Sequence, residues 1–588
     1  MTRPGLARSV LPIVLVTGAL LVLTGLRVGF ILDDYFQLAV LGNPQATQSS
    51  LSLWSWASES QRPLSRDPVQ GGWLPWWTSP DFRINFFRPL PSLLHLLDYR
   101  LYGLDVRGWR ITTLAVWLLL LWAVLRLYKE LAGQAAGVIL LAGLFFAVDE
   151  SHAWSTVWLA ARHSLIAALF VVAAAGSYIK YRRSGSRGSL IAALLFTVLG
   201  LLSSEIAVGV LAWVIAYETT LAREDWKARL RVSAPFFLLV GAYASFYAVA
   251  GFGSRANVWY IDPIYEPVAF LRALPERLPA LFQGLITPIA PEIGPLFGLW
   301  SIALPAQVVA LLVSLAFLPR LRHDPMFRFA GLATLLSLLP LLLARPINYL
   351  LLLPSVGAAW LFASFLAAWW QAWKERRERP DRWPLLAAPA AVFLLIAHGL
   401  VAPVMFALDV EVLQRAHQRP ANLVETAKVP AGMSRVVLVT SSNRLFAGFM
   451  GLAWPMLTPS PGPDAVWMVS PALGPHRFVR TGERSFRLEI PEPGILGSLW
   501  DKMVSDGSGV AAGSRFQQGA MQVEVLRMED EGIREIEVTI DRPLDAPDVC
   551  LLAWNGERLA PIRVPGIGGR AVLSELEQRV EGGAGVAR

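Results

Sequence analysis

Long apolar stretches separated by short polar segments dominate the first 408 residues. Most are long enough for a helix to cross the hydrocarbon core of a bilayer. The first, Ser9 to Val28, follows Arg3 and Arg8, is longer than the apolar core of a secretory signal, and has no small-residue cleavage site before Asp33. We therefore expect it to be retained as a helix. The pattern predicts about eleven transmembrane helices, near residues 9–28, 109–128, 135–149, 157–179, 189–204, 205–221, 234–251, 296–318, 327–344, 350–372 and 384–408.

The stretch 260–295 is punctuated by prolines and leaves two interpretations open. It is either a further span or an amphipathic helix lying in the membrane interface. If it does not cross and the N-terminus is cytoplasmic, all five loop clusters of Lys and Arg lie in the cytoplasm, as the positive-inside rule requires. These clusters begin at Arg126, Lys180, Arg223, Arg320 and Lys374. The chain is thus expected in the bacterial cytoplasmic (inner) membrane, with its C-terminal region extracytoplasmic.

From about Asp409 the pattern changes to short runs typical of strands. Buried strands are expected at 436–440, which a helix follows, and at 465–469. Alternating runs lie at 486–490, 523–525 and 536–540, and turn signals at 481–482, 531–532 and 555–556 separate several of these segments. We predict a polytopic α-helical membrane domain, residues 1–408, and a soluble mixed α/β, sheet-rich domain, residues 409–588. The second domain carries no catalytic signature, so we expect it to bind an acceptor or to be structural.

The first outer loop of the membrane domain, residues 33–107, is rich in aromatic side chains. Amphipathic rings favour the headgroup region, so the loop is expected to form short interfacial helices. A plain aromatic belt and stacking on sugars both remain open. The residues concerned are Trp54, Trp56, Trp73, Trp76, Trp77, Phe82, Phe86 and Phe87.

Composition agrees with a membrane protein. The 588 residues are 54% hydrophobic and 16% charged, whereas about a quarter of the residues of a soluble domain are charged. The net charge of +8 arises from the loop clusters, so no nucleic-acid partner is expected. The single cysteine, Cys550, excludes an internal disulfide and a cysteine metal cluster.

Two adjacent carboxylates, Asp33 and Asp34, follow the first apolar stretch. They repel each other, so one should have a raised pKa unless a cation or a hydrogen-bonded substrate lies close by. This setting suits a proton acceptor. A solvated helix end that only stops the span is the alternative interpretation.

Other unusual polar residues fall on the same predicted outer face: Glu150, His152, Glu205, Arg88, Arg162 and Arg345. The three arginines run against the bias that keeps cations inside. Arg162 starts a span, and an unpaired charge driven to the bilayer centre costs roughly 2.5 to 3.5 kcal/mol. We therefore expect an anionic partner, although each arginine alone is also compatible with snorkelling to headgroups.

The order of short motifs resembles the GT-C superfamily of multi-spanning glycosyltransferases, in particular bacterial relatives of protein O-mannosyltransferases and of tetratricopeptide-bearing O-mannosyltransferases. The similarity covers roughly residues 10 to 370. This chain has Arg162-His163-Ser164 and Ser204-Glu205 where those relatives tend to have Arg-x-Asp and Lys-Glu, and it has no tetratricopeptide repeats. The motifs are Asp33-Asp34, Phe87-Arg88-Pro89-Leu90, Leu101-Tyr102-Gly103-Leu104, Asp149-Glu150-Ser151-His152, Trp158-Leu159-Ala160-Ala161-Arg162, Ser204-Glu205, Arg345-Pro346-Ile347-Asn348-Tyr349 and Leu353-Pro354-Ser355-Val356-Gly357.

The resemblance implies transfer of a sugar from a polyprenyl-phosphate-linked donor to a protein, lipid or envelope-glycan acceptor on the outer face. It implies a base, Asp33 or Asp34, and cations for the leaving phosphate. The expected roles are catalytic for Asp33, Asp34, Glu150 and His152, phosphate-binding for Arg88, Arg162 and Arg345, and acceptor-orienting for Glu205, Trp158 and Tyr349.

No cofactor is certain from the sequence. Some members of the superfamily use a divalent cation, and Mg²⁺ or Mn²⁺ held by Asp33, Glu150 and His152 is an option, but the spacing is not diagnostic. Two other classes stay open. A transporter or flippase of a lipid-linked sugar would favour broken helices near mid-membrane. A non-catalytic envelope-assembly scaffold would act through the C-terminal domain.

Overall fold

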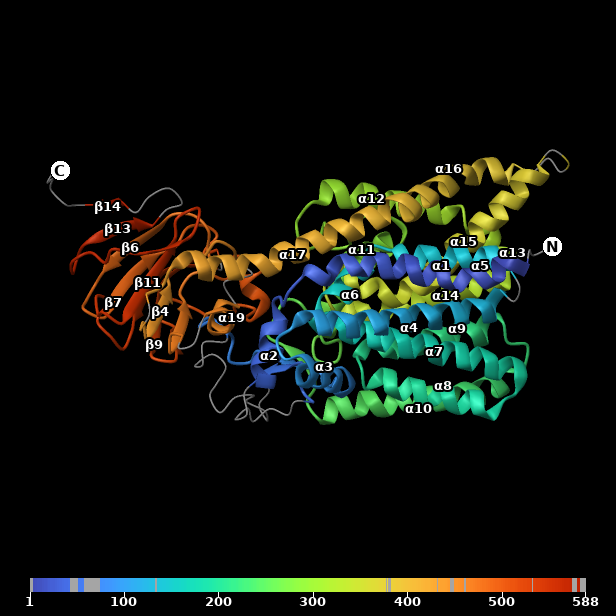
Figure 1. Ribbon diagram of the computed structural model, residues 1–588, viewed down its shortest axis with the longest axis horizontal. Coiled ribbons are helices and arrows are strands. Elements are labelled where there is room, and N and C mark those ends of the chain that lie inside the picture. Colours follow the sequence, from blue (N-terminus) through green and yellow to red (C-terminus); the bar gives the residue numbers. More distant parts are fainter. Residues whose placement is uncertain are drawn as a thin grey trace. The chain divides into compact units, whose positions relative to one another are not determined.

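The computed structural model describes residues 4–42, 51–57, 74–132, 135–376, 378, 382–430, 432–444, 449–458, 462–530, 532–573 and 579–581. Trp73 and Glu531, named above, lie outside the described residues. The chain divides into two compact units (Figure 1). The helical unit comprises Met1–Phe30, Phe86–Phe252 and Ile261–Gln414. The strand-rich unit comprises Ile31–Asn85, Gly253–Tyr260 and Arg415–Arg588. This division differs from the single boundary expected near residue 409.

The helical unit consists of helices joined by short connections. Its α-helices are α1 (Pro4–Leu23), α3 (Pro89–Tyr102), α4 (Val106–Ala132), α5 (Ala136–Val148), α6 (His152–Val157), α7 (Arg162–Ser184), α8 (Arg187–Leu201), α9 (Val210–Thr220), α10 (Trp226–Val249), α11 (Pro267–Ile286), α12 (Trp300–Leu315), α13 (Leu318–His323), α14 (Pro325–Leu338), α15 (Leu352–Glu375), α16 (Trp383–Ile396) and α17 (Ala402–Ala427), the last of which runs past residue 414. Short 3₁₀ helices are η1 (Thr24–Arg27), η2 (Leu159–Ala161), η3 (Glu205–Gly209), η4 (Leu339–Leu343) and η5 (Asn348–Leu351), and a π turn, η6 (Ala397–Val401), joins α16 to α17.

The predicted fold class is confirmed, because every predicted span coincides with helix. Within the described residues, six helical stretches are long and apolar enough to cross a membrane: Ser9–Arg27, Val106–Ala132, Leu159–Ser184, Trp226–Val249, Pro325–Leu343 and Trp383–Ala427. Three shorter apolar helices are Ala136–Val148, Arg187–Leu201 and Trp300–Leu315. The count of eleven spans stays a prediction. The stretch 260–295 contains the helix α11, which is not among these candidates.

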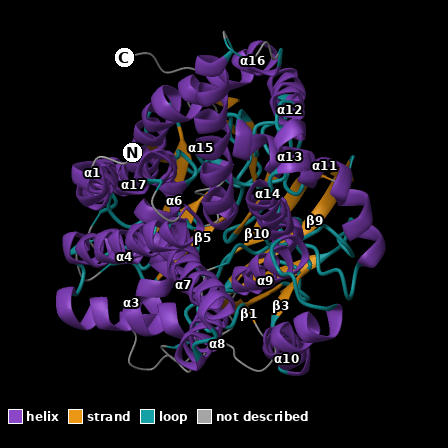
Figure 2. Ribbon diagram, turned by 90° about the vertical axis from the view of Figure 1, so that its right-hand side faces the viewer, coloured by secondary structure: helices purple, strands orange, loops and turns teal. Residues whose placement is uncertain are grey.

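The helix α7 is the centre of the helical unit. It packs against α4 and α8, and Figure 2 shows it between these two helices. Most of its first turns are small or apolar and fully buried, including Ala167, Ala168 and Val171. Small side chains let neighbouring helices approach closely in a membrane protein. The helix therefore presents buried surface on nearly all sides, and a charge at its start lies inside protein.

The strand-rich unit contains two main sheets. The first has four strands in the order β12-β11-β4-β5. Its strands β4 (Arg435–Leu438), β5 (Ala465–Met468) and β11 (Val549–Trp554) are parallel, and the helix α19 (Met450–Leu457) lies between β4 and β5 in sequence. Continuous apolar runs are typical of parallel strands buried on both faces. The edge strand β12 (Leu559–Pro561) is antiparallel to β11.

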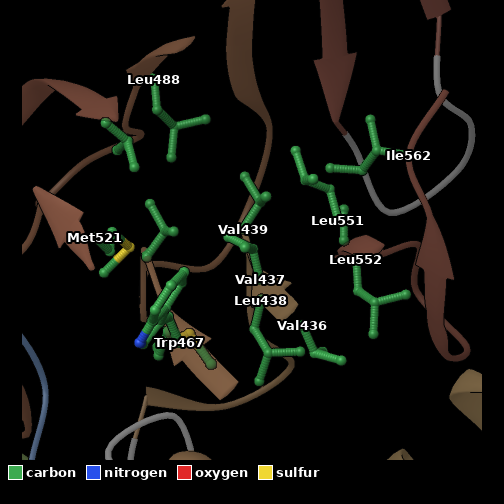
Figure 3. Close-up of a cluster of buried hydrophobic side chains, with 14 of the residues drawn as sticks. Val436, Val437, Leu438, Val439, Trp467, Leu488, Met521, Leu551, Leu552 and Ile562 are labelled. Carbon is green, nitrogen blue, oxygen red and sulfur yellow. The ribbon is translucent and has the colours of Figure 1, made fainter. Parts of the chain in front are cut away.

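The second sheet has seven strands in the order β14-β13-β6-β7-β10-β9-β8 and is antiparallel throughout. Its strands alternate apolar and polar residues, as expected when one face is buried. They are β6 (His476–Arg480), β7 (Ser485–Glu489), β8 (Arg515–Gln518), β9 (Met521–Glu529), β10 (Gly532–Thr539), β13 (Arg570–Leu573) and β14 (Arg579–Glu581), and a 3₁₀ turn, η7 (Asp501–Met503), precedes β8. Side chains from both sheets, such as Leu438 and Leu488, form one buried core (Figure 3).

Residues between η1 and α3, together with β3, complete this unit. They form α2 (Asp33–Gly42), β1 (Ser55–Ala57) and β2 (Arg83–Asn85), and β2 pairs with β3 (Gly253–Arg255). Trp76 and Trp77 belong to the core of the two main sheets; their ring N–H groups donate to Val469 O at 2.9 Å and to Asp501 O at 3.3 Å. The expectation of an interfacial aromatic belt is wrong for these two rings, because they are buried in the strand-rich unit.

We expect Trp76→Ala to destabilise the strand-rich unit by about 3 to 5 kcal/mol, since it removes a large, buried and hydrogen-bonded ring. Resistance of this unit to limited proteolysis across a urea series measures the loss. Ile567→Ala, at a side chain that is 63% exposed in the same unit, is the matched truncation. A similar loss of protease resistance in both variants would contradict the conclusion that Trp76 is part of the core of the two sheets.

Candidate functional site

Short irregular elements gather at one end of the helical unit. The helix α6 packs against η5, α4 and the start of α7, and η3 packs against α7 and η4. Together with the connections beside them, these elements carry the predicted site residues of this unit from residue 150 onward. In a membrane domain, non-helical backbone is tolerated only where protein buries it or where it lines a polar cavity. This layer of short elements is therefore the candidate site.

Arg88 and Glu205 form an ion pair at this layer. Arg88 Nε and Nη2 donate to Glu205 Oε2 at 3.0 and 2.8 Å. The Arg88 guanidinium also lies 4.5 Å from the ring centroid of Phe86, a distance typical of a cation–π contact. The Glu205 side chain remains 27% exposed, so the pair lies at the edge of the protein interior.

The same carboxylate organises a wider network. The Tyr247 hydroxyl donates to Glu205 Oε1, and Phe87 N donates to the Tyr247 oxygen at 2.9 Å. Ser204 Oγ donates to Glu205 Oε2 at 3.2 Å and lies 3.1 Å from His163 Nδ1. Both oxygens of Glu205 are therefore engaged, and α3, α7 and α10 are joined through one side chain.

Arg162 has the anionic partner that its position requires. Its side chain is fully buried, and Nη1 lies 2.6 Å from Asp98 Oδ2. Thr113 Oγ1 accepts from Nη1 at 3.3 Å, and His95 Nδ1 lies 3.1 Å from Nη2 and 3.0 Å from Pro91 O. Burial and the Arg162 charge hold the pKa of His95 well below its ordinary value, which favours the neutral imidazole.

Arg345 lies between η4 and η5, and its Nη1 donates to Pro295 O at 3.2 Å. Glu276 Oε1 is 3.7 Å away, which is an ion pair without a short hydrogen bond. Partial burial lowers the pKa of Arg345, and its side chain is 21% exposed. This predicted phosphate ligand is therefore partly open to solvent.

Glu150 is buried at the turn between α5 and α6. It is 3% exposed, and its Oε2 atom has no hydrogen-bond partner among the described residues. Burial, followed by the charge of Asp149, raises the pKa of Glu150 well above its ordinary value. The charge of Asp409 acts in the same direction. The raised pKa favours the neutral carboxylic acid of Glu150, a form that is able to donate a hydrogen bond.

Glu292 is a second buried carboxyl of this kind. It lies between α11 and α12, and burial raises its pKa to about 8, with a further contribution from the charge of Asp409. Asn348 Nδ2 donates to Asp409 Oδ2 at 3.4 Å. Glu150 and Glu292 are thus both influenced by Asp409, and three stretches distant in sequence contribute to one acidic cluster.

The remaining site residues of the helical unit lie on α6 and η5. His152 Nε2 is 2.8 Å from Ser355 Oγ, and the ring is fully buried. Burial lowers the pKa of His152, so its imidazole is neutral. The rings of Trp158 and Tyr349 meet edge to face with centroids 6.1 Å apart. These two aromatic residues therefore form one contact, as their shared predicted role requires.

Asp33 and Asp34 belong to the other unit, at the start of α2. Asp34 is 2% exposed and its Oδ2 accepts from Ile31 N at 3.0 Å, which satisfies a backbone N–H just ahead of the helix. Asp33 is only half-buried. The preceding Leu32 has a φ of 47°, a left-handed conformation that costs a side chain bearing a β-carbon roughly 1–2 kcal/mol. Strained backbone of this kind clusters at functional sites.

The residues offered for a divalent cation are divided between the two units, and their role as metal ligands stays a prediction. Asp33 lies in the strand-rich unit, whereas Glu150 and His152 lie in the helical unit. His152 Nε2 is engaged by Ser355, and burial raises the pKa of Glu150. Across the described ranges, no group of three or more His, Cys, Asp or Glu side chains has an arrangement that holds a metal ion.

Sequence reasoning missed several residues of this network. Asp98 and His95 are three residues apart and share the buried face of α3, so polar side chains facing an apolar bundle were the signal that could have identified them. Tyr247, Glu292 and Asp409 carry no local signal, because only the fold brings them to the layer.

No protein-family model matches the chain, and no curated protein matches it by sequence. Solved structures do match. ArnT from Cupriavidus metallidurans bound to undecaprenyl phosphate is 14% identical, with 77% of this chain and 85% of that chain covered and a TM-score of 0.37. The oligosaccharyltransferase of Archaeoglobus fulgidus in complex with Zn and sulfate is 12% identical, with 75% and 61% covered and a TM-score of 0.40.

A second structure of the archaeal enzyme, AglB in complex with an inhibitory peptide and a dolichol-phosphate, is 11% identical with a TM-score of 0.38, and 76% of this chain and 63% of that chain are covered. The chain thus spans less than two thirds of the length of AglB. These are proteins that the chain is similar to, at 11 to 14% identity, and the GT-C superfamily remains a resemblance of its motifs. The narrower resemblance to O-mannosyltransferases stays a prediction.

We expect Asp98→Asn to destabilise the helical unit by about 3 to 5 kcal/mol, because it leaves the Arg162 charge buried and unpaired. Thermal unfolding of the purified protein in detergent measures this. The control is Glu411→Gln, which breaks the exposed pair between Arg27 and Glu411, where both side chains are at least 39% exposed. Such a pair contributes about 0 to 1 kcal/mol. Equal shifts in the two variants would argue against a structural role for the buried pair.

Glu292 makes stability depend on pH in a defined direction. Its pKa is 4.5 ordinarily and about 8 in the folded protein, so the folded state keeps a proton that the unfolded chain has released. Stability therefore falls as the pH rises between these two values. We expect Glu292→Gln to flatten this decline, as measured by the thermal midpoint across that range. Glu266→Gln, at an exposed position, should leave the slope unchanged; an unaltered slope in Glu292→Gln would contradict the assignment.

Proposed function

We propose that this integral membrane protein is a glycosyltransferase that moves a sugar from a polyprenyl-phosphate-linked donor to an acceptor on the outer face of the membrane. The observation that carries the proposal is the layer of short elements, which gathers arginines, buried carboxyls and paired aromatic rings at one end of an otherwise apolar bundle. A lipid-linked donor needs such a place, where a hydrocarbon tail stays in the bilayer and a charged head meets polar groups.

The reaction is a displacement at the anomeric carbon. An acceptor hydroxyl forms the new glycosidic bond, the bond from the sugar to the phosphate oxygen breaks, and the hydroxyl proton passes to a base. Asp33 is the proposed base, because it is half-buried and open to an acceptor, whereas Asp34 is 2% exposed. A positioned base typically contributes a factor of about 10² to 10⁴ in rate.

The leaving phosphate gains negative charge as the bond breaks, so fixed cations should lie close to it. We assign this role first to Arg345, whose side chain is 21% exposed, and then to Arg88, which can exchange part of its pairing with Glu205 for a phosphate oxygen. Guanidinium groups suit phosphate geometry. Arg162 fits a structural role better, because Asp98, Thr113 and His95 already engage it.

The neutral carboxyl of Glu150 supplies a hydrogen-bond donor rather than a base. Its Oε2 atom, without a partner among the described residues, is suited to a sugar hydroxyl or a phosphate oxygen. Trp158 and Tyr349, in edge contact, present an apolar surface beside η5 that suits the face of a sugar ring. Glu205 and His152 then act as positioning residues for this layer.

A flippase of a lipid-linked sugar is the second candidate, because interrupted helices are typical of transporters. The π turn η6 and the 3₁₀ elements are such interruptions. Vesicles that contain the purified protein and a labelled polyprenyl-phosphate sugar separate the two classes. Transfer of label to an added acceptor supports the enzyme. Movement of the donor between leaflets without a new glycosidic bond supports the flippase.

We expect Asp33→Asn to lower the rate of transfer by about 10²- to 10⁴-fold, because it removes the proton acceptor and keeps the side-chain shape. Release of labelled glycan product from a lipid-linked donor measures it. The matched variant is the neighbouring Asp34→Asn, which should mainly weaken the start of α2, by about 1 kcal/mol. Full transfer by Asp33→Asn, with normal insertion in the membrane, would refute the assignment of the base.

A further inference from the structure

A separate apolar cavity lies within the helical unit. It has a volume of about 440 Å³, within the usual range of about 300 to 1,000 Å³ for ligand pockets. Its walls come from α11, α12, α13, α14 and α15, and include Phe282, Ser314, Leu335, Ala358 and Phe362. None of the predicted site residues lines it. The helix α12 packs mainly against α11, which leaves space between α12 and the pair α14 and α15.

The few polar groups in the walls are already satisfied. Thr220, Ser314 and Thr334 each donate their hydroxyl to a carbonyl of their own helix, at 2.6, 2.7 and 2.8 Å, to Ala216 O, Ala310 O and Ala330 O. These donors are thus already used within their own helices. Because nearly all the remaining lining is hydrocarbon, the cavity favours an apolar occupant over water.

The cavity reaches the protein surface next to basic residues. Leu335, a wall residue, is 47% exposed, and Leu312 and Leu315 on α12 are also exposed. Arg328 lines the cavity and is exposed, and its Nη1 donates to Arg322 O at 3.0 Å. Among the described residues, neither Arg322 nor Arg328 forms an ion pair with a carboxylate. Positive charge therefore lies beside an apolar opening.

We propose that this cavity holds one acyl chain of an anionic glycerophospholipid, with the lipid phosphate bound beside Arg328 and Arg322. The apolar walls fit the chain, and the two cations fit the headgroup, since a basic residue near a membrane surface attracts anionic lipid. The acyl chain then fills the space between α12 and the pair α14 and α15, and it holds α12 in position against them. The site is distinct from the layer of short elements, and it stands whether or not the protein transfers sugars.

The experiment uses the full chain in phosphatidylcholine vesicles that contain a small fraction of phosphatidylglycerol with a photoactivatable diazirine in one acyl chain. After irradiation, mass spectrometry locates the label. We expect label on peptides that line the cavity, in α12, α14 and α15. Leu335→Trp, which narrows the opening, should reduce this labelling. The matched control is Leu311→Trp, at a position that is 57% exposed on α12 and outside the cavity walls.

A second arm tests the headgroup. Arg328→Gln should reduce the preference for labelled phosphatidylglycerol over labelled phosphatidylcholine by about five-fold, the effect of one basic residue near a membrane surface. Equal labelling in Leu335→Trp and Leu311→Trp would overturn the proposal, because the label would then report general contact with the bilayer. Displacement of the label by undecaprenyl phosphate, but not by unlabelled phosphatidylglycerol, would also overturn it, because the occupant would then be a polyprenyl chain. If Leu335→Trp fails to fold, Ala358→Phe fills the cavity from α15 and carries the same expectation.

Discussion

The pair between Arg162 and Asp98 is the constraint on which the helical unit depends. A fully buried guanidinium at the start of α7 costs far too much free energy to persist alone, so α3 must bring Asp98 to it. Thr113 on α4 and His95 on α3 complete the coordination. One charge thus fixes the positions of three helices. Because α7 also packs against α8 and η3, the geometry of the layer of short elements depends on the pair between Arg162 and Asp98.

Charge at that layer is distributed in two different ways. Arg88 and Glu205 neutralise each other near the surface, whereas Glu150 is buried, has no ion pair among the described residues, and has a raised pKa. Burial raises the pKa of Glu292 in the same way. The layer thus combines ionic groups that a phosphate is able to replace with neutral acids that are able to donate hydrogen bonds. Both are useful to a reaction in which an anion leaves a sugar.

Much of the fold could be predicted from the sequence, because long apolar stretches and period-two alternation report burial directly. The ranges 436–440 and 465–469, for example, coincide with β4 and β5. The layer of short elements was only partly predictable. Glu205 and Arg345 could be predicted as site residues, because they are charges beside apolar stretches. Their partners Tyr247 and Glu276 have ordinary local contexts. Pairing between segments far apart in sequence has no local signature. The interfacial position predicted for Trp76 and Trp77 was wrong, because a ring suited to a membrane interface is equally suited to a protein core.

The strand-rich unit is built from three separate pieces of the chain, and this has a consequence for its biogenesis. Trp76 and Trp77 leave the ribosome hundreds of residues before Val469 and Asp501, whose carbonyls they contact. During synthesis, the two rings therefore cannot make these contacts until the whole helical bundle has been synthesised. A truncated product that stops after the last membrane helix would therefore leave both rings without the carbonyls that they contact in the complete unit.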